Sequence, residues 1–196
     1  MSMNNLIEAV SNYVILFLTE NLSDQLSFHN ISHTYEVVGA SREIGTQTNL
    51  SQEEMLIVQV AAWFHDCGYI NTYIGHEEES KKIAKGFLEN FDCQKNFIDK
   101  VLSCIESTKY PQNPSSLIEK VLCDADLYHF TRTDYSRYEN AIRQEFEQYL
   151  GLIYTDEEWL IKNCNFLTSH SYYTDYGQKI LMKFKEVNIQ LMNCSQ

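Results

Sequence analysis

The dipeptide His65-Asp66 follows an apolar stretch that runs from Met55 to Phe64. If that stretch is a buried helix, an ionised carboxylate at its end is costly unless a cation or a hydrogen-bond donor compensates its charge. The pair therefore points to a bound cation. A single pair of this kind is also typical of an exposed helix end, so other segments have to decide between the two interpretations.

Two further segments carry the same residue types, namely Ser32-His33-Thr34 and Asp124-Ala125-Asp126-Leu127. Their order along the chain resembles that of the HD superfamily, and the resemblance extends over nearly the whole sequence. The superfamily resemblance begins at Phe28-His29-Asn30-Ile31-Ser32-His33-Thr34 and reaches the C-terminal helix. The sequence is most similar to a bacterial group of small predicted HD phosphohydrolases, through five blocks: Trp63-Phe64-His65-Asp66, His76-Glu77-Glu78-Glu79-Ser80, Ile105-Glu106-Ser107-Thr108-Lys109, Asp124-Ala125-Asp126-Leu127 and Ala141-Ile142-Arg143-Gln144-Glu145.

The resemblance implies a bundle of helices that holds a divalent cation by two histidines and two aspartates. On this chain the ligands are then His33, His65, Asp66 and Asp126. Mixed imidazole and carboxylate ligands suit Mn²⁺, Fe²⁺, Co²⁺, Ni²⁺ or Zn²⁺, whereas a pure Mg²⁺ or Ca²⁺ site favours oxygen throughout, so Mg²⁺ is the less expected ion. Such a metal polarises a phosphoryl oxygen and supplies hydroxide near neutral pH. Asp66 is expected to take part in the reaction as well.

The last ligand has two candidates, because either Asp124 or Asp126 could face the metal from one helix. Asp126 aligns with the Ala-Asp-Leu core of the motif and is preferred as the metal ligand. Asp124 is expected to hydrogen-bond one of the metal-ligating side chains without contacting the metal itself. His29 stands in a Phe-His-Asn setting just before the first ligand. This setting favours a structural or ligand-supporting role for His29 over direct metal binding.

His76 and Glu77 are expected to begin the next amphipathic helix, where they could project toward the same cleft. The alternative is a solvated acidic helix start, since Glu77, Glu78 and Glu79 all favour the positive end of the helix dipole. The resembling group has a polar residue followed by Glu at this place. We therefore expect a catalytic role, with His76 as a general acid and Glu77 orienting it or the attacking water.

Three more residues are candidates for the walls of the cleft. Lys109 is one of few basic residues near a motif and is a possible phosphate anchor, although a surface lysine is the alternative. His170 lies in a segment that resembles the C-terminal His-Tyr-Thr of the group and is expected to help close the pocket. His129 lies in no motif and is expected to be structural.

The sequence differs from two classes of HD enzymes at positions that bear on the number of metal ions and on the substrate. Multi-metal HD enzymes, including cyclic dinucleotide phosphodiesterases, carry further histidines in the middle helices, where this chain offers only His76. One metal is therefore favoured, although a second stays open. The Rel/Spo class places an acidic pair soon after the His-Asp, whereas Cys67-Gly68-Tyr69-Ile70 follows here, which disfavours hydrolysis of guanosine tetraphosphate.

The leading hypothesis is a metal-dependent enzyme that hydrolyses a phosphomonoester or phosphodiester bond of a nucleotide or related small molecule. The runner-up is a regulatory module that binds metal or nucleotide without turnover. A complete ligand set favours catalysis, because a degenerate domain has no reason to retain it. An unliganded helical scaffold conflicts with the clustering of histidine and aspartate in motif order.

The elements that position these residues are predicted to be helices. Apolar residues recur at helical spacing in three stripes, which predict three amphipathic helices facing a shared core. The stripes are Ala84/Phe87/Leu88/Phe91, Ile98/Val101/Leu102/Ile105 and Ile180/Phe184/Val187/Leu191. The stretch from Met55 to Phe64 is apolar on nearly every face and should be the most buried helix, ended by Gly68. Capping boxes at Ser51/Glu54, Ser116/Glu119 and Thr155/Glu158 mark helix starts, and Lys109 to Ser115 is the clearest loop.

Composition sets the outer bounds. The 196 residues predict an all-α helical bundle forming one HD-type domain, with a motif core at about 28–130 and a C-terminal helical extension at 131–196. A net charge of -12 disfavours nucleic acid as a partner and leaves a small phosphorylated substrate. The six scattered cysteines indicate reduced thiols that mostly fill the core. The longest apolar run near the N-terminus, Tyr13 to Leu18, is too short for a membrane span, so no membrane contact and a cytoplasmic location are expected.

Overall fold

The computed structural model describes residues 3–194, and every regular element in these residues is helical. The α-helices are α1 (Met3–Asn21), α2 (Ile31–Gln47), α3 (Gln52–Phe64), α4 (His76–Asn90), α5 (Lys95–Ser107), α6 (Leu117–Asp126), α7 (Tyr135–Leu150), α8 (Asp156–Ser169) and α9 (Met182–Leu191). Short 3₁₀ turns follow α3 and α6 as η1 (Cys67–Ile70) and η2 (Tyr128–Thr131), and a π turn, η3 (Gly177–Leu181), leads into α9. The all-α prediction is confirmed.

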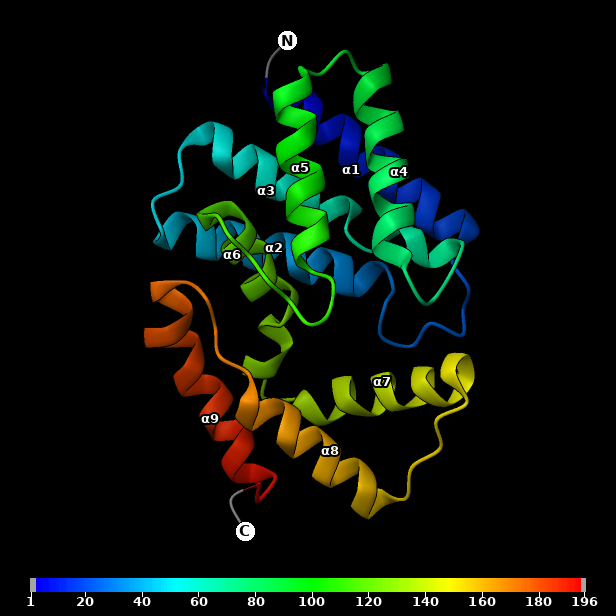
Figure 1. Ribbon diagram of the computed structural model, residues 1–196, viewed down its shortest axis with the longest axis vertical. Helices are drawn as coiled ribbons and strands as arrows, with labels where there is room; N and C mark the ends of the chain where they lie inside the picture. Colours follow the sequence, from blue (N-terminus) through cyan, green and yellow to red (C-terminus); the bar gives the residue numbers. More distant parts are fainter. Residues whose placement is uncertain (1–2, 195–196) are drawn as a thin grey trace.

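Helix α3 lies at the centre of the main core and packs against α1, α2, α5 and α6. Its residues from Ile57 to Phe64 are all buried, as the apolar stretch predicted. Figure 1 shows α1–α6 as one group of helices, with α7–α9 below them. A smaller apolar cluster of Phe130, Tyr135 and Leu167 underlies the lower group. None of the helices in the described residues is long and apolar enough to cross a membrane.

Local sequence signals fix most helix starts. At Ser51/Glu54, Ser116/Glu119 and Thr155/Glu158, the hydroxyl accepts from the N3 amide and the glutamate accepts from the N-cap amide, so all three capping boxes are confirmed. The stripes predicted for α4 and α5 also face the core, with their innermost residues fully buried. Residues 109–115 form a loop, as predicted.

The stripe predicted for α9 is wrong. Phe184, Val187 and Leu191 are 54%, 49% and 69% exposed, whereas Lys185 and Asn188 are buried. The two buried side chains donate hydrogen bonds to backbone carbonyls, Lys185 to Leu167 and His170, and Asn188 to Phe130 and Arg132. The polar side chains on the inward face of α9 can be buried because they are hydrogen-bonded. A prediction from the spacing of apolar residues therefore chose the opposite, exposed face of the helix.

Gly68 does not terminate α3 in the way the sequence suggested. The helix ends earlier, at Phe64, and Gly68 lies within η1. A Cβ at position 68 would stand 1.9 Å from the carbonyl oxygen of His76, so glycine is needed to let the start of α4 approach. The amide of Gly68 also donates to the hydroxyl of Ser80 over 2.8 Å. This close approach brings His76 and Glu77 beside the His65-Asp66 pair.

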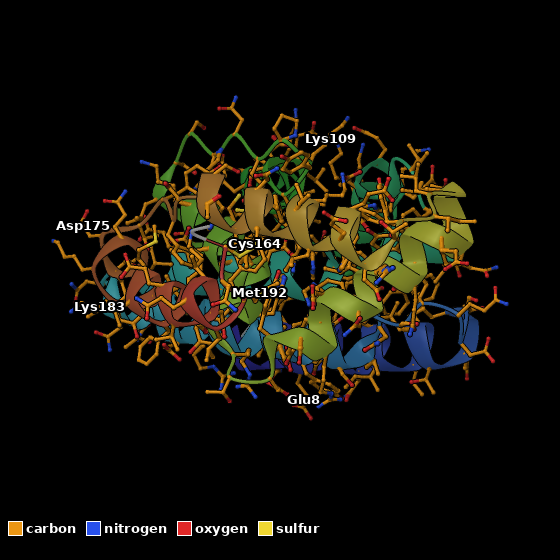
Figure 2. The ribbon with its side chains drawn as sticks, turned by 90° about the horizontal axis from the view of Figure 1, so that it is seen from below. Glu8, Lys109, Cys164, Asp175, Lys183 and Met192 are labelled. Atoms are coloured by element: carbon orange, nitrogen blue, oxygen red, sulfur yellow. A yellow bond between two sulfur atoms is a disulfide. The ribbon has the colours of Figure 1, made fainter. Side chains whose placement is uncertain are left out.

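The expectation of six reduced thiols is wrong for one pair. Cys164 of α8 and Cys194 in the turn after α9 form a disulfide, which joins the two helices at the C-terminal end of the chain (Figure 2). Cys67, Cys93, Cys104 and Cys123 are free, and three of these four are buried. The two cysteines are 30 residues apart in sequence and meet only because α8 and α9 pack side by side, so no CxxC spacing could indicate the bond.

Candidate functional site

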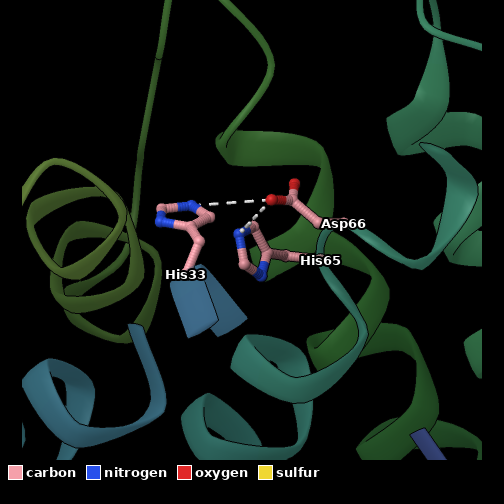
Figure 3. Close-up of side chains that lie close together, drawn as sticks. All are labelled: His33, His65 and Asp66. Carbon is pink, nitrogen blue, oxygen red and sulfur yellow. Dashed lines mark ion pairs between the residues drawn. The ribbon is translucent and has the colours of Figure 1, made fainter. Parts of the chain in front are cut away.

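Four acidic and imidazole side chains meet where three helices converge. His33 lies in the first turn of α2, His65 and Asp66 follow α3, and Asp126 ends α6. The Nε2 atom of His33 is 3.5 Å from Asp66 Oδ2 and 3.3 Å from Asp126 Oδ1. The Nε2 atom of His65 is 3.1 Å from Asp66 Oδ2 and 3.7 Å from Asp126 Oδ1. Figure 3 shows both rings turned toward the Asp66 carboxylate.

Local structure orients both histidines. Asn30 caps α2, and its side chain accepts from the amides of Ser32 and His33, which fixes His33 at the helix start. The Nδ1 atom of His65 lies 2.8 Å from the carbonyl oxygen of Ala62. A carbonyl can only accept, so Nδ1 carries a proton and Nε2 is the nitrogen that faces the cluster.

The site combines buried charges of opposite sign. Burial lowers the pKa of His65, but Asp66 and Asp126 outweigh it and raise the pKa to about 9. Burial raises the pKa of Asp66, yet the adjacent His65 holds it well below its ordinary value. Burial also raises the pKa of Asp126, but the hydrogen bond from His33 and the positive charges of His65 and His33 together give a net lowering.

The cluster fits a metal ion. His33, His65 and Asp66 each offer one ligand atom, and these atoms all lie within 4.8 Å of one another. His65 Nε2 and Asp66 Oδ2 are buried without a hydrogen-bond partner among the described residues, which is costly unless something binds them. Two imidazole nitrogens and two carboxylates are a donor set that suits a divalent transition metal.

The role expected for Asp124 is wrong. Its carboxylate accepts from the amides of Tyr173 and Thr174 and from the Thr174 hydroxyl, at 2.7 to 2.9 Å. Asp124 therefore holds the segment before η3 and does not support a histidine of the cluster. Of the two candidate aspartates, the structure turns Asp126 toward His33 and His65.

His29 lies beside the cluster and is held by a residue from the C-terminal group of helices. The fully buried Glu145 of α7 accepts from the amides of Phe28 and His29, from His29 Nδ1 and from the hydroxyl of Tyr73. Burial lowers the pKa of His29, but the hydrogen bond to Glu145 and nearby carboxylates give a net rise. Sequence matching included Glu145 at the end of one block and gave it no role, since only the fold shows that it reaches His29.

His76 and Glu77 are not a solvated helix start. Their side chains are only 16% and 10% exposed, and His76 Nε2 lies 3.7 Å from Asp66 Oδ1 and 3.7 Å from Glu77 Oε1. The imidazole of His76 stacks on Tyr69 with ring centroids 3.8 Å apart. Burial lowers the pKa of His76 despite the nearby carboxylates. The structure thus brings the pair to the cluster, and its catalytic role stays a prediction.

Asp66 and Asp126 line a cavity of about 720 Å³ between the two groups of helices. Lys109 lies on its rim in the loop after α5, and Figure 2 shows this residue near one edge of the molecule. In the same loop, Gln112 donates to Asp126 Oδ2 over 3.3 Å. Its carbonyl accepts from the hydroxyl of Tyr173, so the loop is tied to the C-terminal segment. Gln112 belongs to no motif, and its role was not predicted.

His170 and His129 also line this cavity. The Nζ atom of Lys185 lies 3.4 Å from His170 Nδ1. An ammonium group only donates, so Nδ1 of His170 accepts and the ring proton is at Nε2. This Nε2 atom is buried and has no hydrogen-bond partner among the described residues. Burial and Lys185 lower the pKa of His170 to about 3, so its ring is a neutral donor. His129 Nδ1 lies 3.1 Å from the carbonyl oxygen of Asp126, and this contact with the end of α6 is consistent with a structural role.

Comparison with known proteins was made for the sequence and for the structure. The family model for the HD domain matches residues 30–131, which is just over half of the chain. The chain belongs to the HD domain family. All four clustered residues fall within the matched range, and HD domains are associated with divalent metals and hydrolysis.

The crystal structure of a predicted HD superfamily hydrolase from an uncultured Thermotogales bacterium has a similar fold, with a TM-score of 0.64. The two sequences are 20% identical, and the match covers 98% of this chain and 96% of the other. The shared fold therefore extends beyond the HD core to the C-terminal helices. No curated protein matches the sequence.

Proposed function

We propose that this HD domain protein is a metal-dependent phosphohydrolase that uses metal-activated water to cleave a phosphomonoester or phosphodiester of a small molecule, with nucleotides as the first class to test. The observation that carries the proposal is that two buried atoms 3.1 Å apart, His65 Nε2 and Asp66 Oδ2, make no hydrogen bond within the described part of the chain and lie beside a cavity large enough for a small molecule. Their neighbours His33 and Asp126 complete a set of four ligands.

The proposed ligands are His33, His65, Asp66 and Asp126, whose donor atoms face one another. A divalent metal held by them supplies a Lewis acid for the phosphoryl oxygen and lowers the pKa of bound water. Glu145 keeps His29 at the rim of the cluster, and Gln112 holds one oxygen of Asp126. These contacts orient the site before substrate binds.

The proton for the leaving oxygen is assigned to His76. The Nδ1 atom of His76 lies 3.2 Å from the carbonyl of Tyr73, so Nε2 is the nitrogen that faces Asp66 and Glu77. Because Nδ1 donates to that carbonyl, a proton at Nε2 belongs to the imidazolium form, which Asp66 and Glu77 favour and burial disfavours. Nε2 gives this proton to the leaving oxygen as the bond to phosphorus breaks, and the ring returns to its neutral form. Lys109, the cation on the rim, is assigned to the phosphate.

The test is release of inorganic phosphate from a panel of nucleotides, cyclic nucleotides and model phosphate esters by protein loaded with Mn²⁺. Asp66→Asn should lower the rate by at least about 100-fold, because the change removes a charged ligand. Asp175→Asn is the matched control, since Asp175 is exposed at the surface, pairs with Lys179 and does not line the cavity (Figure 2). Binding of metal and nucleotide without release of phosphate would favour the regulatory alternative.

A further inference from the structure

The two ends of the cavity differ in charge. At the end near the cluster, the lining includes three carboxylates, those of Asp66, Glu77 and Asp126. Lys109 is the only lysine or arginine among the described residues that line it. The imidazole of His170 adds no positive charge, because burial and Lys185 lower its pKa to about 3.

This balance limits the charge that the substrate can bring. The three positive charges of one divalent cation and one lysine equal the three negative charges of the carboxylates, so a phosphate dianion in contact with the metal and Lys109 is the largest anionic charge we expect this end to accept. A triphosphate carries about twice that charge and is usually bound by several Lys, Arg or backbone donors. This cavity offers no such set in the part of the chain that the structure describes.

The opposite end of the cavity is apolar. Ile142, Phe146 and Leu150 of α7 line it, together with Phe166 of α8 and Tyr110 of the loop after α5. These residues are not fully covered by the rest of the protein, since all of them are intermediate or exposed. An apolar wall that stays uncovered next to a polar centre favours an apolar group of the ligand.

The apolar surface continues beyond this cavity into a hollow of about 810 Å³ between α7 and α8. Five residues line both spaces, namely Tyr110, Ile142, Phe146, Phe166 and Ser169. Glu139 and Lys162 have partners within the hollow, since Glu139 accepts from Trp159 and Asn163 and the ammonium of Lys162 faces the ring of Tyr154. Glu158, which also lines the hollow, accepts from Thr155. The shared wall therefore has room for a bulky group attached to the phosphate.

We propose that the substrate carries a single phosphate on a bulky, apolar or aromatic alcohol, with the phosphate at Lys109 and the cluster and the body against Ile142, Phe146 and Phe166. This inference rests on the proposed function and adds the substrate class to it. A nucleoside monophosphate is within this class, whereas nucleoside triphosphates and small polar phosphate esters are outside it.

The first experiment compares 2-phenylethyl phosphate with ethyl phosphate. Both release a primary alcohol of similar basicity, so the comparison isolates the contribution of the apolar body. We expect kcat/KM for 2-phenylethyl phosphate to be higher by at least about 10-fold, because the ring is bound in an apolar pocket. We also expect adenosine monophosphate to inhibit this reaction at lower concentration than adenosine triphosphate when Mn²⁺ is in excess.

The second experiment removes part of the wall. Phe166→Leu should raise KM for 2-phenylethyl phosphate several-fold and leave kcat/KM for ethyl phosphate unchanged. Phe184→Leu is the matched control, since Phe184 is 54% exposed on α9 and lines neither space. A folding defect in Phe166→Leu would lower both rates together, and Phe146→Ala then repeats the comparison at a second position on the wall.

The outcomes separate the two proposals. Equal kcat/KM for the two alkyl phosphates, or stronger inhibition by the triphosphate, overturns the substrate class and leaves phosphohydrolase activity standing. Absence of phosphate release from every ester, with metal bound, overturns the proposed function and this inference with it.

Discussion

The helices α2, α3 and α6 and the helices α7–α9 border the same cavity and contribute different things to it. The first group supplies His33, His65, Asp66 and Asp126, and the Nε2 atom of each histidine lies 3.1 to 3.7 Å from an oxygen of each aspartate. The second group supplies apolar side chains and a neutral imidazole. We infer from this comparison that the first group carries out the reaction and the second group selects the substrate. Substitutions in the first group should therefore lower kcat or metal content, and substitutions in the second group should change KM or stability.

The largest expected effect of a substitution outside the four ligands is at His76, which begins α4 and lies beside the ligands of the first group. His76→Ala should lower kcat by about 10² to 10⁴-fold with metal content intact, because a positioned general acid contributes that range. Glu77→Gln should act in the same direction. The control is Glu78→Gln on the exposed side of α4. Full activity of His76→Ala and Glu77→Gln across the pH range would remove the pair from the reaction.

Loss of the disulfide should affect only the second group. Cys164→Ser should lower the free energy of unfolding by about 2–4 kcal/mol, because the bond restricts the unfolded chain, while metal content stays unchanged. Cys93→Ser, at a free thiol, is the control. Titration of the unfolded protein with a thiol reagent should detect four thiols. Six thiols, or equal stability of the two variants, would contradict the assignment.

Glu145 connects the two groups, since it lies on α7 and holds the backbone and ring of His29. Glu145→Gln removes one acceptor and the negative charge, and it should lower kcat/KM by about 10 to 100-fold. Metal content should be retained, because the four ligands are untouched. Glu147→Gln, at an exposed position on the same helix, is the control. Unchanged activity in Glu145→Gln would show that the second group shapes only the apolar wall.

Much of the first group could be predicted from the sequence, and less of the second. His33, His65 and Asp126 stand in short motifs, and the capping boxes of α3 and α6 depend only on residues three apart, as does the one box found in the second group, that of α8. Lys185 was missed because a buried lysine on a polar inward face breaks the rule that apolar spacing marks the core. The disulfide was missed because its members are 30 residues apart and meet only through helix packing.

The smallest expected effect is on the free energy of unfolding and concerns the capping boxes, one in each group of helices. Burial raises the pKa of Glu119, but hydrogen bonds from Ser115, Ser103 and Ser116 outweigh it and lower the pKa to about 2. Its contribution to stability is therefore present above the ordinary glutamate pKa and is lost as pH falls toward 2. Glu119→Gln should cost about 1 kcal/mol at pH 7. Glu158→Gln, in the exposed box of α8, should cost less when the unfolding of both variants by urea is compared. An equal cost would contradict the difference in burial.

The central claim is that His33, His65, Asp66 and Asp126 hold one metal ion, and elemental analysis of purified protein tests it most directly. We expect close to one equivalent of a divalent transition metal in the native protein, and loss of most of it in His33→Ala and Asp126→Ala. Asp124→Asn should keep its metal, because the carboxylate of Asp124 is bonded to Tyr173 and Thr174 instead. Unchanged metal content in both His33→Ala and Asp126→Ala would contradict the ligand set.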